Sequence, residues 1–414
     1  MNSITQKTIF IGIDWADQTH AWHLESERTQ IAGTLKQDAA AIQTWIQQLR
    51  KQYPNCQFAV AIEASKGALV AALLGHDDIT IYPINPAAAA AYRKAFAHGG
   101  GKNDPSDALL LCQYLVHYKN RLKPLRLNQP LTRELAAMAE DRRRLVDQRT
   151  AHCNELKAVL KTYFPEVLKL EAARIYADFI LAFLLKYPSL DVAQKAGVKQ
   201  LRKMFYGVGS KAKAETRVQL LLDATPLSRD PVHIQTCVMR VSALVSLIST
   251  FNAQIRIYQA RIAEQVTGHA DYAIYKSLPG ASNLTHSRMI AAMGDDRARY
   301  SESCSLQAAS GIAPLTKQSG KQKLVSARWA CTKFLRQTFH EYAGLSITKS
   351  KWAAAYYKQQ RDKGKDPQMA KRALAYKWQR IIFRCWKDKV PYDEAKYIQR
   401  LKETRSPLYK LIEA

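Results

Sequence analysis

The sequence lacks the cysteine pairs that mark metal or disulfide sites. No CxxC pair occurs, and no histidine stands at zinc-site spacing from any cysteine. The seven cysteines are scattered singly, at Cys56, Cys112, Cys153, Cys237, Cys304, Cys331 and Cys385. We therefore expect reduced thiols in packed positions, and neither a structural zinc site nor a disulfide framework.

Long apolar runs and acidic residues are also scarce. No stretch approaches the roughly 20 uninterrupted apolar residues of a membrane span, and the N-terminal MNSITQK holds no apolar signal-peptide region. Asp and Glu number 35 against 62 Lys and Arg, which gives a formal net charge of +27 and a pI near 9.8. Such a charge favours a polyanionic partner, which can be DNA, RNA or an anionic membrane surface. A cytoplasmic nucleic-acid-binding protein is the economical inference.

The chain itself has 414 residues, enough for two or three domains. Its first third alternates strand-like and helix-like patterns in the order β-β-β-α-β-α-β-α. The first three strands suggest an antiparallel meander. We expect strands over residues 8–14, 20–25, 29–37, 57–63 and 79–85, and helices over 39–52, 65–75, 86–97 and from near Pro105.

Four acids occupy particular points in this order. Asp14 ends the first strand, Glu63 ends the fourth, and Asp104 and Asp107 open the last helix. Each alone could be a turn former or a helix cap, as Asp104 before Pro105 could be. Together they can converge, and converging carboxylates need a counter-charge such as hard divalent ions. Two ions about 4 Å apart would hold a scissile phosphodiester. This is the pattern of the ribonuclease-H-like fold, and of its RuvC-like branch.

The middle of the chain changes to helical periodicity after a basic, proline-containing linker at 119–130. Residues 131–159 and 241–262 each repeat side chains at 3-4 spacing, which predicts an antiparallel helix pair or a coiled coil between protomers. Arg142, Arg149 and His152 lie in the first seam and are expected to set register or to be partly exposed rather than to catalyse. Residues 166–235 predict several shorter helices inserted at the end of the pair.

The C-terminal third contains a second group of chemically interesting residues. Residues 275–295 predict two helices around a Pro-Gly turn, which can grip a phosphate backbone or be a plain helical turn. Ser319 precedes Gly320 in a loop expected to be exposed, and its hydroxyl could reach a phosphodiester. The alternative is a basic phosphate-binding loop with an incidental serine, because no nearby residue supplies a base. We expect nucleic-acid contacts from Lys317, Lys321, Lys323, Arg328 and Lys333.

Aromatic and basic residues are interleaved near the C-terminus. Trp352, Tyr356, Tyr357 and Lys358 could stack on bases and neutralise phosphate, although aromatic residues at helical spacing more often pack in a core. Leu374, Ile381 and Ile382 are expected to be core residues.

These segments together resemble a known family. GIDWA with Asp14, AIEAS with Glu63 and KNDPSDA with Asp104 and Asp107, followed by LPG, AASGIAP and QSGK, resemble the DEDD transposases of bacterial insertion sequences, which are related to the Piv/MooV invertases. The resemblance spans nearly the full length of the chain. It implies an α/β RuvC-like domain over 1–125, a coiled-coil helical domain over 126–270 with the insertion at about 166–235, a mostly helical transposase domain over 271–400 and a tail over 401–414.

The resemblance also implies an activity. Asp14, Glu63, Asp104 and Asp107 would bind Mg²⁺, two ions per site, and Ser319 would be the nucleophile that forms a covalent link to DNA. A structured bridge RNA would guide recombination between donor and target duplexes, within a homo-oligomer that is a dimer or, on DNA, a tetramer. Such a protein would be cytoplasmic and associated with the bacterial nucleoid, with no membrane partner. Two alternatives stay open: a metal-dependent junction-resolving nuclease that uses water, with Ser319 only binding phosphate, and a non-catalytic nucleic-acid binder.

Overall fold

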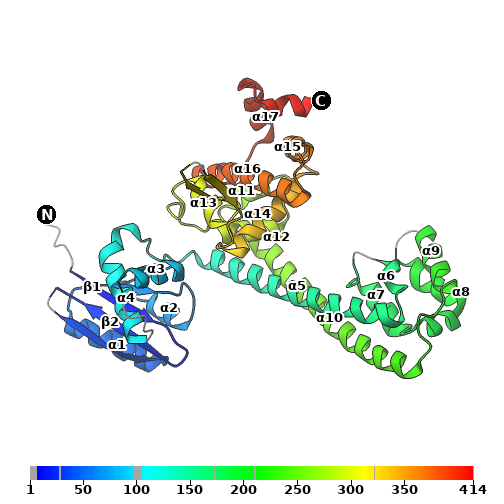
Figure 1. The fold of residues 1–414 in the computed structure, drawn as a ribbon, viewed down its shortest axis with the longest axis horizontal. Helices are drawn as coiled ribbons and strands as arrows, with labels where there is room; N and C mark the ends of the chain where they lie inside the picture. The colour runs from blue at the N-terminus through cyan, green and yellow to red at the C-terminus, as the bar shows by residue number, and fades with distance from the viewer. Residues whose placement is uncertain are drawn as a thin grey trace. The chain divides into compact units, whose positions relative to one another are not determined.

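The computed structural model describes residues 7–27, 29–96, 104–171, 174–208, 211–320 and 322–413. The chain divides into two compact units, Met1–Leu127 and Asn128–Ala414, here called the first and the second unit. Their helices and strands are shown in Figure 1. Each unit is considered by itself below.

The first unit is a five-stranded sheet with helices on both faces. Its strands are β1 (Thr8–Asp14), β2 (Thr19–Glu25), β3 (Gln30–Lys36), β4 (Gln57–Ile62) and β5 (Ile79–Pro83). Its helices are α1 (Ala39–Gln52), α2 (Ala68–Leu73), α3 (Pro86–Phe96), α4 (Asp104–Tyr118) and the 3₁₀ turn η1 (Lys119–Arg121). The strand order is β3-β2-β1-β4-β5, with β1, β2 and β3 antiparallel and with β4 and β5 parallel to β1.

The predicted order of these elements is observed, and the largest difference in bounds is at the second helix. Residues 65–75 were expected to be helical, whereas α2 covers only Ala68–Leu73. Gly67, just before it, has φ +128°, which is a backbone conformation outside any helix. The helix therefore cannot begin earlier.

Strand alternation gives the sheet two different faces. On one face Ile9, Ile11 and Ile13 of β1 join residues of β4, α1 and α2 in one core. The opposite face is lined by smaller residues, Ala59 and Ala61, and packs against α3 and α4. The helix α4 therefore lies on the face to which Gly12 belongs.

The second unit is built on two long helices, α5 (Pro130–Tyr163) and α10 (Pro231–Val266). Between them come α6 (Val167–Leu170), α7 (Asp178–Lys186), α8 (Leu190–Tyr206) and α9 (Lys211–Leu222). After them come α11 (Tyr272–Lys276), α12 (Asn283–Met293), α13 (Ser303–Ala309), β6 (Leu315–Ser319), β7 (Gln322–Ser326), α14 (Lys333–Ser346), α15 (Lys351–Asp362), α16 (Pro367–Asp388), α17 (Glu394–Glu403) and α18 (Pro407–Glu413).

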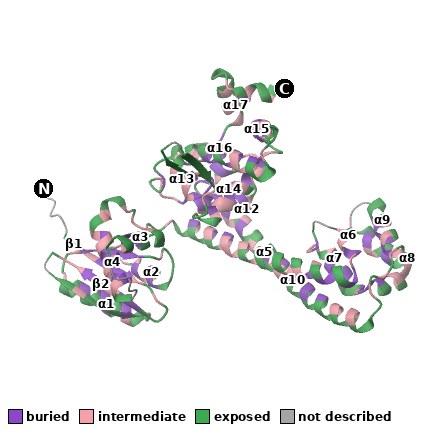
Figure 2. Ribbon diagram, in the orientation of Figure 1, coloured by how far each residue is buried: buried purple, intermediate pink, exposed green. Residues whose placement is uncertain are grey.

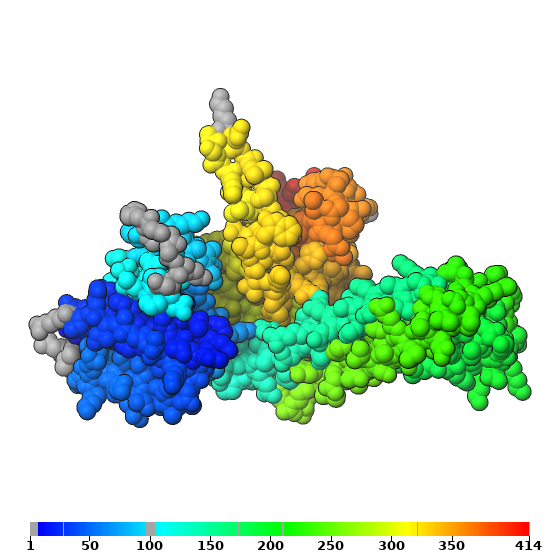
Figure 3. Space-filling view, turned by 60° about the horizontal axis from the view of Figure 1, so that its bottom comes forward, coloured from blue at the N-terminus to red at the C-terminus, as the bar shows by residue number. Residues whose placement is uncertain are grey.

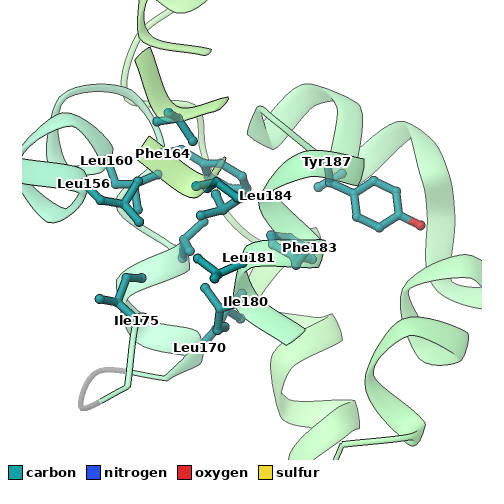
Figure 4. Packing of buried hydrophobic residues seen from close by; sticks show 14 of the residues in the cluster. Leu156, Leu160, Phe164, Leu170, Ile175, Ile180, Leu181, Phe183, Leu184 and Tyr187 are labelled. Atoms are coloured by element: carbon teal, nitrogen blue, oxygen red, sulfur yellow. The ribbon is translucent and has the colours of Figure 1, made fainter. Parts of the chain in front are cut away.

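The long helices run antiparallel and carry a hydrophobic core at each end. One core combines Leu156 and Leu160 of α5 with Val245 of α10 and with the short helices α6 to α9. Figure 4 shows Leu156, Leu160 and Phe164 packed against Ile180, Leu181 and Leu184. The other core includes Leu135 and Val266 and extends through α12, α14 and α16. In Figure 2 buried residues gather around these helices and within the sheet of the first unit.

Within this unit the structure decides between several sequence-based alternatives. The matching 3-4 patterns form an antiparallel pair inside one chain. The last inserted helix, α9, ends at Leu222 and α10 begins at Pro231, so residues 231–235, which were expected in the insertion, belong to α10. The helix α10 is long and apolar enough by composition to cross a membrane. Because it pairs with α5 and contributes to both cores, we interpret it as a core helix.

For the C-terminal part, one expectation needs correction, and for Trp352 the structure favours the packing alternative. The segment around Ser319 was expected to be a loop, but it forms the two-stranded hairpin β6–β7. Trp352 was considered for base stacking, but its side chain is fully buried and its indole N–H donates to Tyr392 Oη at 2.7 Å. Trp352 is therefore a packing residue. Leu374 and Ile382 are buried as expected, and Ile381 is half-buried.

Candidate active site

The strands of the first unit bring Asp14 and Glu63 to neighbouring positions. Ile13 of β1 pairs in parallel with Ile62 of β4, and the two acids are the next residues along their strands. Neighbouring strands lie about 4.8 Å apart. By alternation Asp14 follows Gly12 onto the face that α4 covers. Two carboxylates predicted from distant parts of the sequence are therefore adjacent at one end of the sheet.

The helix α4 supplies the other two acids from its first turn. Asp104 is its first residue and is exposed, whereas Asp107 is only 5% exposed. Residues three apart lie on the same side of a helix. Asp107 and Glu63 both line one small pocket, together with Arg93 and Tyr92 of α3. The pocket thus brings together an acid from a strand end and an acid from the helix.

Gly12 explains how α4 can lie so close to β1. A Cβ atom at this position would stand 2.1 Å from the carbonyl oxygen of Ala108 and 2.4 Å from the backbone nitrogen of Cys112. Both atoms belong to the backbone of α4, so no side-chain rotation could relieve the overlap. The Cys112 thiol also contacts the Phe10 carbonyl oxygen at 3.5 Å, and burial raises the pKa of this thiol to about 12. The close approach holds the first turn of α4 beside the end of β1.

Arg93 is the charged partner of Asp107. Its Nη2 atom lies 2.6 Å from Asp107 Oδ1, and the Arg93 side chain is 26% exposed. The contact is an ion pair without hydrogen-bond geometry, because neither Asp107 Oδ1 nor Arg93 Nε has a hydrogen-bond partner. Sequence reasoning missed Arg93. The available signal was a basic residue at the end of the helix that precedes the two helix-opening acids.

The acids suit a hard divalent cation by their chemistry. Carboxylate oxygens are the ligands that such ions prefer, and Asp107 Oδ1 is a buried acceptor with no hydrogen bond. Among the residues that the structure describes, no three His, Cys, Asp or Glu side chains are drawn close enough together to hold a metal ion. Instead, the guanidinium of Arg93 balances Asp107. The four acids therefore fit a metal site by the type of their donor atoms, and Arg93 is the counter-charge of Asp107.

Ser319 lies in the second unit, at the end of β6. Its side chain is exposed, and Gly320 follows it with φ +55°. Cross-strand pairs alternate between the two faces of the hairpin. The pairs Ser319–Gln322 and Lys317–Leu324 share one face, whereas Gln318–Lys323 lies on the other. Figure 3 shows the hairpin (yellow) projecting from the second unit.

The remaining basic residues around the hairpin differ in exposure. Lys333 is exposed at the start of α14, and Arg328 is half-buried, with its carbonyl oxygen accepting from Arg336 Nη2. Lys321 lies outside the described residues. Trp329, which sequence reasoning passed over, is 82% exposed beside the Arg336 guanidinium, whose carbon lies 5.9 Å from the ring centroid. An exposed tryptophan among cations is a surface suited to stacking.

Comparison with known proteins identifies the chain. A transposase family model, DEDD_Tnp_IS110, matches residues 11–165, and a second model, described as the transposase IS116/IS110/IS902 family, matches residues 272–358. The chain belongs to the DEDD transposases of insertion sequences. It is accordingly an enzyme that acts on DNA. The first match contains all four acids of this transposase, and the second contains Ser319.

Curated relatives resemble this transposase over most of its length. The mini-circle putative transposase for IS117 from Streptomyces coelicolor is 26% identical, over 94% of this chain and 96% of the relative. The IS900 uncharacterized 42 kDa protein from Mycobacterium paratuberculosis is 26% identical over 74% of this chain and 76% of the relative. The IS110 uncharacterized 43.6 kDa protein from Streptomyces coelicolor is 23% identical over 71% and 73%. DEDD transposases generally use divalent metals.

Proposed function

We propose that this transposase cuts and rejoins donor and target DNA through a covalent bond between Ser319 and DNA, assisted by Mg²⁺ at Asp14, Glu63, Asp104 and Asp107. A structured bridge RNA guides the choice of both DNA partners. The observation that carries the metal part is the pocket shared by Glu63 and Asp107, beside the adjacent strand end of Asp14. The strand order, with its antiparallel β1–β3 and its parallel β4 and β5, supports a RuvC-like domain.

Each side chain has a defined task in this proposal. The acids would hold divalent ions, and such ions would neutralise the scissile phosphate and stabilise the attacking and leaving oxygens. The exposed Ser319 Oγ forms a bond to phosphorus and releases its proton to water. The bond from phosphorus to the DNA oxygen breaks, and that oxygen takes up a proton from water. The phosphoserine bond conserves the energy needed for rejoining. Lys317, on the same hairpin face as Ser319, offsets phosphate charge.

The charge of the protein supports an assembly with several nucleic acids. A net charge of +27 exceeds what one folded domain needs for solubility, and Lys and Arg release counterions when they bind phosphates. An RNA and two duplexes sharing one homo-oligomer, a dimer or a tetramer on DNA, would use this excess. Sequencing the RNA that co-purifies with the protein tests the guide directly; recovery of only random cellular RNA would contradict it.

Trapping tests the nucleophile. The full-length protein is incubated with nicked donor and target DNA and Mg²⁺, denatured, and examined for protein that stays attached to DNA. Ser319→Ala should abolish the attached species, whereas Ser326→Ala, which removes an exposed hydroxyl from the same hairpin, should retain it. Asp107→Asn should lower its yield at least about a hundredfold, the scale of losing one electrostatic group at a reacting phosphate.

The same experiment separates the alternatives. Cleavage that persists in Ser319→Ala, without attached protein, would replace this mechanism with that of a water-using nuclease. DNA binding without cleavage in the unmodified protein, under every metal condition, would leave a binding protein. In either case the serine mechanism is rejected.

A further inference from the structure

The helices α16 and α17 enclose a groove that none of the proposed catalytic residues touch. Its volume is about 1160 Å³. Its positively charged lining residues are Lys377, Arg380, Arg384, Lys396 and Arg400. Its lining does not include Ser319, the four acids of the proposed metal site or the basic residues of the hairpin. The groove is thus a separate feature of the second unit.

The cations form two rows that face the same groove. Lys377, Arg380 and Arg384 are spaced three and four residues apart on α16, and Lys396 and Arg400 are spaced four apart on α17, so each set shares one side of its helix. From Lys377 to Arg384 the row on α16 advances by seven residue steps, about 10 Å along the helix axis. Two rows of positive charge therefore line the two walls of one groove.

These charges are largely unneutralised. Of the five cations in the groove, Arg384 alone forms an ion pair with a described residue. Its partner, Asp388, does not line the groove. Burial, followed by the neighbouring Arg380, lowers the pKa of Lys377. The other four cations have no ion-pair partner among the described residues, so an anionic ligand could bind to them.

The two acids in the lining are already engaged in the fold. Asp393 accepts from the Lys396 backbone N–H at 3.0 Å and caps α17. Glu394 Oε1 accepts from Ser350 Oγ and from the Lys351 backbone N–H, each at 3.0 Å. These hydrogen bonds fix the positions of the two carboxylates but leave their charges in place. Two acids against five cations still leave the lining positively charged, so a negatively charged occupant fits the groove.

Aromatic rings between the rows indicate what kind of anion fits. Phe383 and Tyr397 line the groove and are half-buried. The ring of Tyr397 is held 5.0 Å from that of Trp352, so it is fixed in place while part of it stays open. Paired bases within a duplex cover their faces by stacking, whereas unpaired bases can stack on protein rings beside cations that hold the phosphates.

We propose that the groove between α16 and α17 binds a single-stranded segment of nucleic acid, with phosphates on the two cation rows and bases on Phe383 and Tyr397. The inference goes beyond the proposed function, because it requires neither the Ser319 chemistry nor a guide RNA. Its ligand chemistry, a phosphodiester chain with unpaired bases, is shared by RNA and DNA.

The test uses the full-length protein and three labelled probes: oligouridine, oligothymidine and a duplex of the same length. The double variant Lys396→Gln/Arg400→Gln removes two exposed charges from the groove. Lys349→Gln/Lys363→Gln removes two exposed charges from positions that flank α15 and is the matched control, since neither residue lines the groove. Binding is followed by fluorescence anisotropy across a salt series, and thermal unfolding checks that all variants are folded.

The groove variant should bind one or both single strands at least tenfold more weakly than the control variant. Its log-log salt slope should be less steep by about 1.4, the value for two lost single-strand phosphate contacts. The probe that loses affinity identifies the source: loss only with oligouridine assigns RNA, and loss only with oligothymidine assigns DNA. Phe383→Leu should weaken single-strand binding about fivefold or more with an unchanged salt slope, because it removes stacking and no charge.

Two results would overturn the proposal. One is equal single-strand affinity in the groove variant and the control variant. The other is a loss of duplex affinity as large as the loss of single-strand affinity. Both can be observed whether or not the protein forms a covalent bond to DNA, so the proposed function and this inference are tested separately.

Discussion

Asp107 and Arg93 form the ion pair of a buried carboxylate at the proposed metal site. A buried charge that has lost its solvent needs a partner, and removal of one partner leaves the other uncompensated. Here the partner is an arginine of α3, 2.6 Å away. A divalent ion bound to Asp107 would also balance its negative charge, so either Arg93 or the ion could neutralise this carboxylate.

Arg93→Ala should therefore make the stability of the first unit depend on divalent metal. In EDTA we expect its thermal midpoint to fall by several degrees, because the loss of an ion-pair partner of a buried acid costs on the order of 2 kcal/mol when that partner is partly exposed. Addition of Mg²⁺ or Mn²⁺ should restore most of the loss, since binding to the folded state alone stabilises it. Differential scanning calorimetry with and without metal measures both effects.

Lys94→Ala is the matched control, because it removes the same charge from the next residue of α3, which is exposed. Its midpoint should shift little, and equally in EDTA and in metal. Equal losses in the two solutions for Arg93→Ala would assign Arg93 a purely structural role. Absence of any metal response in the unmodified protein would argue against the metal site itself.

Among single residues, the four acids could be picked out from the sequence, but Arg93, the counter-charge of Asp107, could not. Asp14 and Glu63 were predictable because an acid at the end of a strongly apolar strand has a position dictated by the strand. Arg93 was not predictable, because which of several cations reaches Asp107 depends on how α3 packs against α4. The exposure of Trp329 was likewise hidden, since most tryptophans in this chain are at least partly buried.

At the scale of elements, the hairpin β6–β7 determines which lysine accompanies Ser319. Both strands are exposed along nearly their whole length, so a side chain's face is set by the cross-strand register and not by a core. Lys317 shares a face with Ser319, and Lys323 lies on the opposite face. Both lysines are exposed, and they lie two residues before and four residues after Ser319.

Lys317→Ala should lower the yield of the Ser319–DNA species about tenfold or more, because a charge near the attacked phosphate is lost from the reacting face. Lys323→Ala should lower overall DNA affinity slightly and leave the yield per bound complex within about twofold. Quantifying attached DNA at saturating protein separates the two effects. If both variants lose the same amount, the register does not select the lysine.

The hairpin also shows why its sequence indicated a loop. The strand sequences LTKQS and QKLVS are short and mostly polar. They lack the alternation of apolar and polar residues that predicts a strand packed on a core. The first strands of the chain, in contrast, bury alternate apolar residues and were predicted almost to the residue. The long helices were predictable for the same reason, because their repeated seams enter the two cores.

At the scale of the whole molecule, the two units have separate cores, so local damage in one should stay within it. Gly12→Ala places a Cβ atom 2.1 Å from the Ala108 carbonyl oxygen, and α4 must move to accept it. We expect a loss of about 3 kcal/mol of unfolding free energy in the first unit. Hydrogen exchange should quicken in peptides of the first unit and stay unchanged in those of the second.

Gly75→Ala provides the control, because its added Cβ would meet nothing closer than 3.6 Å. Its effect should remain within about 0.5 kcal/mol. Faster exchange in α5 or α10 after Gly12→Ala would show that the units do not unfold independently.

The exposed hairpin has a consequence for when the enzyme reacts. Two short strands without a core behind them have little intrinsic stability, so a bound strand of DNA would contribute much of what orients the Ser319 hydroxyl. The reactive group would then stay idle in the free protein and become competent only on its substrate. A transposase built this way would limit damage to its host without a dedicated inhibitor, because the reaction would wait for the DNA that it is meant to cut.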